Sequence, residues 1–159
     1  MLRTSSKKKS SAQGGFTVLE LLFVMFIVAI LAVFAIPAYI GFIQKARETA
    51  VVSYLSKIKK AEEVHRLGLN SGGLYSNSFD VLEDTGIVPP ATGISSRVEH
   101  DYTFDLTAGV DGSSLPYWRV NAAPLSSDAS AKWFYIDDQG PVRYETGAAA
   151  TASSPVLKR

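Results

Sequence analysis

The chain has 159 residues, of which 47% are apolar and 19% are charged, so its length predicts one domain with at most a small attachment and excludes a large multi-domain enzyme. Its 16 basic and 15 acidic side chains nearly balance, but residues 1–15 hold four basic groups and no acid, which leaves 12 basic against 15 acidic groups in the rest. That remainder gives no charge-based reason to expect nucleic acid as a partner.

The first predicted element is a membrane-spanning helix over residues 16–44. Residues 21–44 contain no charged side chain. A helix from Phe16 to Ile43 would extend about 42 Å at ~1.5 Å per residue, enough to cross a hydrocarbon core of roughly 30 Å. The three lysines Lys7, Lys8 and Lys9 precede it. The positive-inside preference therefore predicts a cytoplasmic N-terminus and a C-terminal part outside the cytoplasm.

Three interpretations of this segment are open on the residues alone. A secretory signal peptide would be cut at the Val33-Phe34-Ala35 site, but its apolar core should be only about 7 to 15 residues long. A plain single-pass anchor fits the length. The third interpretation starts from Glu20, because an ionised carboxylate in a span costs on the order of 3 kcal/mol and needs compensation.

Gly14 and Gly15 indicate where that compensation arises, because a protease could accept this small, flexible pair in extended form. A cut after Gly15 would create a charged amine at Phe16, close to Glu20 in the chain. The amine of one subunit and Glu20 of the next would then neutralise each other inside an apolar bundle. A buried carboxylate of this kind is useful only in an assembly.

These residues belong to a longer motif, Lys9-Ser10-Ser11-Ala12-Gln13-Gly14-Gly15-Phe16-Thr17-Val18-Leu19-Glu20-Leu21-Leu22. The motif resembles the cleavage and methylation signature of type IV pilins and of the pseudopilins of type II secretion. The resemblance implies that a prepilin peptidase removes the basic leader, residues 1–15, and that Phe16 is N-methylated. It also implies that Glu20 is the carboxylate that sets the register between subunits, and that Pro37 is a helix-loosening proline.

Pro37 has a physical interpretation of its own. It lacks the N–H that would bond the Val33 carbonyl, and its ring crowds that carbonyl, at a cost of roughly 3 kcal/mol within a helix. A simple kink is one outcome. The other is a stretch that unwinds when subunits pack into a filament, and both can hold in different states of the protein.

The helix is predicted to continue outside the membrane over residues 45–68. Its apolar stripe, at three- and four-residue steps, consists of Val51, Tyr54, Leu55, Ile58, Ala61 and His65. The charged side chains between them, Lys57, Lys59, Lys60, Glu62 and Glu63, are expected to lie largely off this stripe. Gly68 and the Asn70-Ser71-Gly72-Gly73 cluster are expected to end the helix near Leu67.

Residues 69–146 predict a loop followed by an antiparallel meander. Ser78 is expected to cap a short helix over residues 79–85. Alternating side chains predict two strands, centred on Phe104 and Val120, and residues 132–136 and 142–145 predict a hairpin around the turn 137–141. Residues 147–159, rich in Ala, Ser and Thr, predict a flexible tail. The predicted fold class is therefore α+β, with a long N-terminal helix, membrane-spanning in its first half, packed against a C-terminal antiparallel sheet.

No pattern indicates an enzyme, a cofactor or a metal site. The absence of cysteine excludes thiol nucleophiles and cysteine-ligated metals. His65 is interpreted as covering the edge of the core rather than acting as a ligand or base. Asp137 and Asp138 could hold calcium through their oxygens, but we interpret them as solvated turn residues.

Two further groups could serve a partner, and we give each a structural interpretation. Lys57, Lys59 and Lys60 could attract DNA, but they interleave with acids and are interpreted as solvated helix charges. Tyr117 and Phe134, taken as surface aromatics, are interpreted as sheet packing rather than a ligand platform.

The sequence thus predicts a structural subunit precursor that waits in the inner membrane, is cut after Gly15, is methylated at Phe16 and polymerises into a type IV pilus-like filament. The predicted partners are identical subunits in a helical homopolymer, the prepilin peptidase and methyltransferase, the inner-membrane assembly machinery, and membrane lipid before assembly. The final location is an extracellular pilus or a periplasmic pseudopilus. Two alternatives stay open: a pseudopilin of a type II secretion system, and a single-pass membrane-anchored binding domain.

Overall fold

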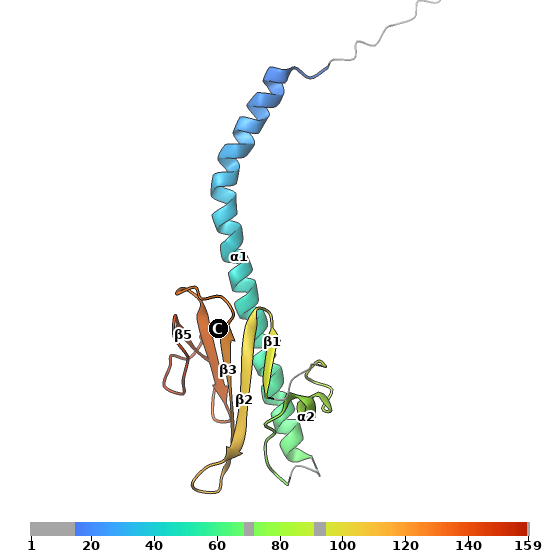
Figure 1. Cartoon of the computed structure of the whole chain (residues 1–159), viewed down its shortest axis with the longest axis vertical. Coiled ribbons are helices and arrows are strands. Elements are labelled where there is room, and N and C mark those ends of the chain that lie inside the picture. The colour runs from blue at the N-terminus through green and yellow to red at the C-terminus, as the bar shows by residue number, and fades with distance from the viewer. Residues whose placement is uncertain (1–14, 69–71, 91–94, 159) are drawn as a thin grey trace, which may run out of the picture. The chain divides into compact units, whose positions relative to one another are not determined.

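A computed structural model describes residues 15–68, 72–90 and 95–158 of the chain. The chain forms two compact units, Met1–Phe42 and Ile43–Arg159. The helix α1, Val18–Leu67, runs through both. The second unit also holds the short helix α2, Phe79–Glu83, and five strands: β1 (Ser96–Glu99), β2 (Tyr102–Val110), β3 (Pro116–Pro124), β4 (Lys132–Asp137) and β5 (Arg143–Thr146) (Figure 1). The predicted α+β architecture is confirmed.

The second half of α1 supplies one side of the core. Its buried apolar side chains are Val51, Val52, Tyr54, Leu55, Ile58 and Ala61. All but Val52 belong to the stripe that the sequence predicted. The predicted Gly68 end is also close to the observed end at Leu67, whereas Asn70 and Ser71 lie outside the described residues.

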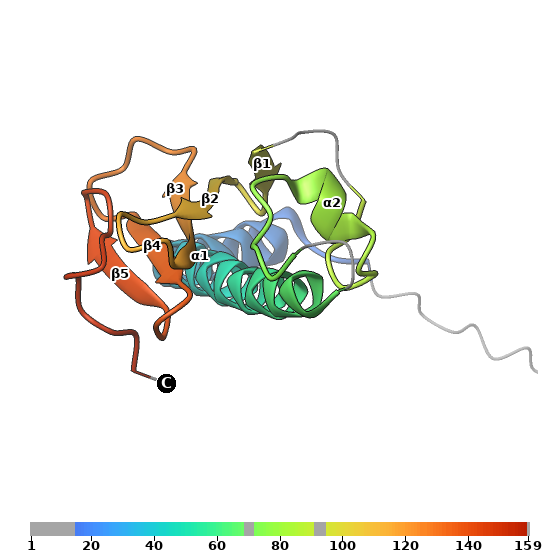
Figure 2. The ribbon, with the colours of Figure 1, turned by 90° about the horizontal axis from the view of Figure 1, so that it is seen from below.

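The strands form one antiparallel sheet in the order β1-β2-β3-β4-β5. Register pairs Leu106 with Val120 and Phe104 with Ala122, so the predicted inward side chains of β2 and β3 meet on the face toward α1. Phe134 on β4 belongs to this core at 1% exposed, so it is not a surface aromatic. Figure 2 shows α2 and β1 on one side of the second half of α1, and β4 and β5 on the other.

Strand β1 was not predicted, because its alternation is inverted in polarity. The apolar Val98 is 58% exposed, while Arg97 is only 4% exposed. The Arg97 guanidinium donates to the Pro89 carbonyl at 2.7 Å and to a Glu99 carboxylate oxygen at 2.6 Å, and it lies 5.2 Å from the centre of the Tyr54 ring. These partners compensate the buried charge and tie the loop before β1 to the helix.

The short helix differs from its prediction at both ends. Ser78 occupies the N-cap position but makes no side-chain capping bond. The Ser76 hydroxyl instead accepts the Ser78 N–H at 3.1 Å and donates to the Ser78 carbonyl at 3.0 Å. The helix ends at Glu83 rather than at residue 85. The Gly86 N–H donates to the Glu83 carbonyl, and Gly86 has a φ of 70°, a left-handed conformation that ends a helix.

The C-terminal segment makes defined contacts, in contrast to the flexible tail that its composition predicted. Val156 forms a bridge with Arg143, so residues 155–157 extend the sheet beyond β5. The Tyr144 N–H donates to the Pro155 carbonyl at 3.0 Å, and the Leu157 N–H donates to the Val142 carbonyl at 2.9 Å. Backbone pairing holds this segment together with a few apolar contacts, since Ala150 is 3% exposed and Leu157 packs against the core, and composition does not reveal backbone pairing.

Glu62 lies inside the core, contrary to its predicted place off the apolar stripe. It is four residues after Ile58, on the same helix face, and it is 0% exposed. One carboxylate oxygen accepts the Ser76 N–H at 2.9 Å, and the other has no partner among the described residues. Burial raises the pKa of Glu62 to about 7, and the Ser76 N–H opposes this rise.

We predict that residues 45–159 form a soluble, folded monomer, and that Phe104→Ala destabilises it by roughly 3–5 kcal/mol. The Phe104 ring is fully buried and packs edge-on to Tyr54 at 4.8 Å between ring centres, so alanine leaves a cavity. Urea unfolding followed by circular dichroism measures the change. Asp105→Ala, which removes an exposed side chain from the same strand, is the control and should leave stability unchanged; equal midpoints for both variants would contradict this packing.

We predict that the free energy of unfolding of this unit falls as pH rises from about 4.5 to 7. The folded pKa of Glu62 exceeds the unfolded value, so the folded state binds more protons in this window and loses stability as the carboxyl ionises. The loss should be on the order of 3 kcal/mol. Glu62→Gln should flatten this slope and unfold at higher urea than wild type at pH 8. A wild-type slope retained in the variant would assign it to other groups.

Candidate assembly site at the start of α1

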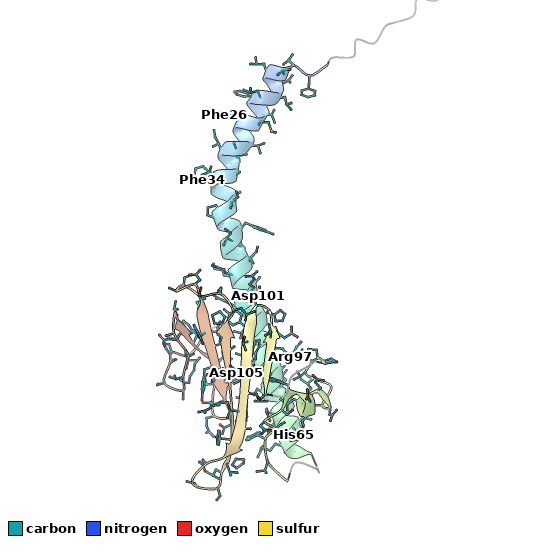
Figure 3. All side chains as sticks on the ribbon, in the orientation of Figure 1. Phe26, Phe34, His65, Arg97, Asp101 and Asp105 are labelled. Atoms are coloured by element: carbon teal, nitrogen blue, oxygen red, sulfur yellow. The ribbon has the colours of Figure 1, made fainter. Side chains whose placement is uncertain are left out.

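The part of α1 in the first unit presents apolar side chains all round. Every large apolar side chain from Val18 to Phe42 is at least 43% exposed, and Phe26 and Phe34 are 61% and 74% exposed (Figure 3). Among the described residues, α1 is the one helix long and apolar enough to cross a membrane, a property that signal sequences share. A surface of this kind needs lipid or other apolar helices around it.

Thr17 fixes where α1 begins. Its carbonyl accepts the Leu21 N–H at 3.2 Å, and its hydroxyl oxygen accepts the Glu20 N–H at 3.1 Å. A threonine at the N-cap with a glutamate three residues later is the spacing of a capping box, in which the glutamate side chain reaches back to the cap N–H. This signal was readable in the sequence, and it offers Glu20 a role within a single subunit.

The structure contains only half of that capping box. The Thr17 side chain bonds the Glu20 backbone, but no bond returns from the Glu20 carboxylate to Thr17. Within the described residues this carboxylate makes no hydrogen bond or ion pair, and Glu20 is exposed. The positive end of the helix dipole favours a negative charge here. The carboxylate is therefore placed at the helix start and left available for a group outside the subunit.

The predicted cleavage position precedes the helix. Gly15 and Phe16 have no regular secondary structure, and both are exposed, Phe16 by 83%. A Cβ atom added to Gly15 would meet nothing within 4 Å. Gly14 and the rest of the predicted leader lie outside the described residues. The peptide bond between Gly15 and Phe16 thus lies in a stretch that an enzyme can bind in extended form.

Pro37 lies inside α1, and the helix continues on both sides of it. Of the two predicted outcomes for this residue, an unwound stretch is absent from the single subunit described here. Pro37 removes one backbone hydrogen bond from the helix in any case. It is separated in the chain from Thr17 and Glu20 and does not join them in one local cluster.

Comparison with known families identifies this segment. Residues 10–36 match the family model described as the prokaryotic N-terminal methylation motif. The match supports a type IV pilin-like prepilin family. Matching residues include Gly14 to Glu20 and end just before Pro37. No curated protein and no solved structure matched the chain in the same comparisons.

The prepilin motif implies processing by a prepilin peptidase and assembly into a pilin-type filament, and with the apolar helix it suggests membrane anchoring as a precursor. Proteins of this family are structural pilin-type subunits. The motif is common to pilus and pseudopilus precursors. It matches 27 residues, so the second unit must be interpreted from its own geometry.

The two aspartates of the β4–β5 turn and Lys59 make hydrogen bonds within the chain. The Gln139 N–H and side-chain amide donate to Asp137 and Asp138 at 3.2 and 2.6 Å, within the turn between β4 and β5. His65 is half-buried on α1. The described ranges contain no group of three or more His, Cys, Asp or Glu side chains placed to hold a metal ion. Lys59 donates to the Gly140 carbonyl at 3.0 Å.

We predict that the processed protein begins with Phe16 carrying one methyl group, and that Gly15→Ile retains the leader. The β-branched side chain would lie where the peptidase needs a very small one. N-terminal mass spectrometry of membrane fractions measures both. Gly15→Ala is the matched control and should still be cut, since it adds only a Cβ atom, which meets nothing within 4 Å at this position. A mature terminus at Ile36 would establish ordinary signal-peptide cleavage instead.

Proposed function

We propose that this prepilin is the structural subunit of a type IV pilus-like filament. The precursor is held in the inner membrane by the first part of α1, with its basic leader in the cytoplasm and its second unit outside. It is cut after Gly15, methylated at Phe16, and transferred from lipid into a helical homopolymer through α1. Identical subunits, the prepilin peptidase and the inner-membrane assembly machinery are its partners.

The availability of the Glu20 carboxylate is the observation that carries this proposal. Glu20 is followed by 24 residues without a charged side chain, and its carboxylate has no partner within the described subunit. The half-formed capping box explains why the backbone of Glu20 is held but not why a carboxylate is needed. The amine that cleavage creates at Phe16 supplies the missing cation.

Pairing between subunits explains how one charge both permits and directs assembly. Within a bundle of apolar helices, an unpaired carboxylate or ammonium is strongly unfavourable, whereas a matched pair is tolerated. A subunit that enters with its Glu20 beside the Phe16 amine of its neighbour is therefore favoured over one that enters out of register. Before cleavage Phe16 has no free amine, so an uncut precursor cannot form the Glu20–Phe16 pair and is not favoured for entry into the filament.

Pro37 contributes to the transfer from lipid to filament. The helix lacks one hydrogen bond at this residue, so a local loss of helical structure costs less here than elsewhere in α1. We infer that neighbouring helices in the filament use this weak point to adjust their packing. The same scheme serves a surface pilus and a periplasmic pseudopilus, and the place where processed filaments accumulate distinguishes the two.

We predict that Glu20→Ala and Glu20→Gln insert and are cut almost normally but assemble poorly. Glutamine keeps size and hydrogen bonding but cannot neutralise an ammonium group among apolar helices. Sheared surface filaments, or pseudopili on overexpression, are quantified against processed subunit in the membrane. Co-expression with wild type should let few mutant subunits enter filaments.

Asp105→Ala is the control for loss of an exposed carboxylate elsewhere, and it should keep wild-type filament yield. Unchanged yield from both Glu20 variants would remove the pairing mechanism. The single-pass anchored binding domain would then be the better explanation of the apolar helix.

A further inference from the structure

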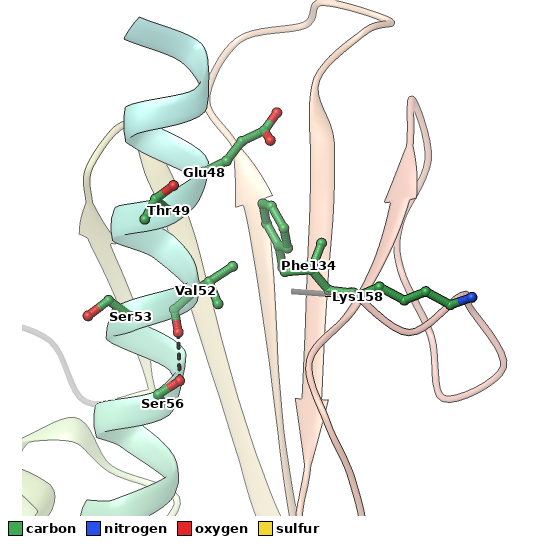
Figure 4. A pocket seen from close by; sticks show the side chains of 8 residues that line it. Glu48, Thr49, Val52, Ser53, Ser56, Phe134 and Lys158 are labelled. Atoms are coloured by element: carbon green, nitrogen blue, oxygen red, sulfur yellow. Dashed lines mark hydrogen bonds between the residues drawn. The ribbon is translucent and has the colours of Figure 1, made fainter. Parts of the chain in front are cut away.

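The second unit carries a groove between α1 and β4 that the core does not fill. A cavity of about 430 Å³ is lined by Thr49, Val52, Ser53 and Ser56 of α1, by Phe134 of β4, and by Leu157 and Lys158 of the C-terminal segment (Figure 4). A second cavity of about 330 Å³ shares Val52, Ser56 and Leu157 with it and extends to Lys59 and the β4–β5 turn. The two form one continuous groove, which we call the α1–β4 groove.

The groove offers an apolar floor with little unmet hydrogen bonding on its helical wall. The Thr49 hydroxyl donates to the Lys45 carbonyl at 2.8 Å, and the Ser56 hydroxyl donates to the Val52 carbonyl at 2.9 Å. These small side chains are thus satisfied by their own helix and allow close approach. Val52 and Phe134 line the floor of the groove at 9% and 1% exposed, and the half-buried Leu157 is the more accessible apolar side chain beside them. The groove suits an apolar side chain of modest size.

Two lysines, Lys59 and Lys158, belong to the lining of the groove, and Figure 4 shows the Lys158 side chain extending away from α1. Glu48, at one end, is already paired with Lys132 at 2.6 Å. Lys59 donates to a carbonyl, and neither Lys59 nor Lys158 has an acidic partner in the part of the chain that the structure describes. An occupant with carboxylates beside an apolar side chain would complement these two lysines.

Helix α2 and the residue after it present that combination on the opposite side of the same unit. Val81 is 39% exposed, and the exposed carboxylates of Asp80 and Asp84 flank it in the chain. Neither aspartate forms an ion pair among the described residues. Because α2 and β4 lie on opposite sides of α1, as Figure 2 shows, α2 cannot enter the groove of its own chain.

We propose that α2 of one subunit docks in the α1–β4 groove of the next, with Val81 on the apolar floor and Asp80 and Asp84 beside Lys59 and Lys158. The partner is a second copy of this chain, and the inference rests on the proposed filament. The two surfaces differ, so the contact is heterologous and repeats along a fibre instead of closing a dimer. It adds a contact between second units to the contact between helices.

Cross-linking tests this contact directly because the natural chain contains no cysteine. Ser53→Cys and Val81→Cys, combined in one chain, place one thiol in the groove and one on α2. A short bis-maleimide reagent applied to sheared filaments should give a ladder of covalent oligomers. Each single variant should give at most dimers. Ser53→Cys combined with Asp105→Cys, on the outer face of the sheet, is the matched control and should give no ladder.

If the double-cysteine chain assembles poorly, a charge-reversal series tests the docking of α2 in the α1–β4 groove instead. Lys158→Glu and Asp84→Lys should each lower filament yield about fivefold relative to processed subunit, and the two together should restore it. If wild type forms filaments, then filaments of the double-cysteine chain that give no ladder, or charge-reversed chains that show no rescue, would overturn this contact while leaving the filament intact. An absence of filaments from wild type itself would overturn the proposed function and this contact with it.

Discussion

The buried face of α1 is the main surface against which the sheet packs, and Phe79 and Leu82 of α2 complete the same core. The second unit has no other long helix among its described residues, so the side chains from Val51 to Glu62 decide which strand positions can be buried. Phe104, Val120 and Phe134 come from three strands and meet this same stripe. Strand register follows from that constraint, because a shift by one residue would turn each of these side chains toward solvent.

Periodicity predicted the parts of the fold in which residue type and position agree. The stripe of α1 and the alternation in β2 and β3 are such cases. It failed where a polar side chain occupies a buried position. Glu62 has the spacing of a core residue, but its charge predicts a place on the surface. Strand β1 is missed for the same reason, because its buried side chain is the charged Arg97. Their partners, Ser76 and the Pro89 carbonyl, come from loops that sequence spacing does not bring together.

The candidate site differs from these buried polar residues. Its signals lie close together in the sequence, and it makes few tertiary contacts. Gly15, Phe16 and Glu20 were found from cost and spacing, and the family model covers them. Thr17 and Glu20 have the spacing of a capping box, a local signal that an interpretation of Glu20 by its charge alone does not use. Among the described residues the Glu20 carboxylate makes no hydrogen bond or ion pair, so the fold of one chain does not explain why this position carries a charge.

The added strand segment at residues 155–157 has a consequence for solubility. Open sheet edges expose unpaired backbone N–H and C=O groups, through which copies of a protein can pair without control. Here the Pro155 carbonyl and the Leu157 N–H both point toward β5, so between them only Val156 turns its backbone groups outward, and the opposite edge strand, β1, is only four residues long. Both edges thus offer few unpaired backbone groups to a further strand, which limits edge-to-edge pairing and amyloid-like aggregation of this unit.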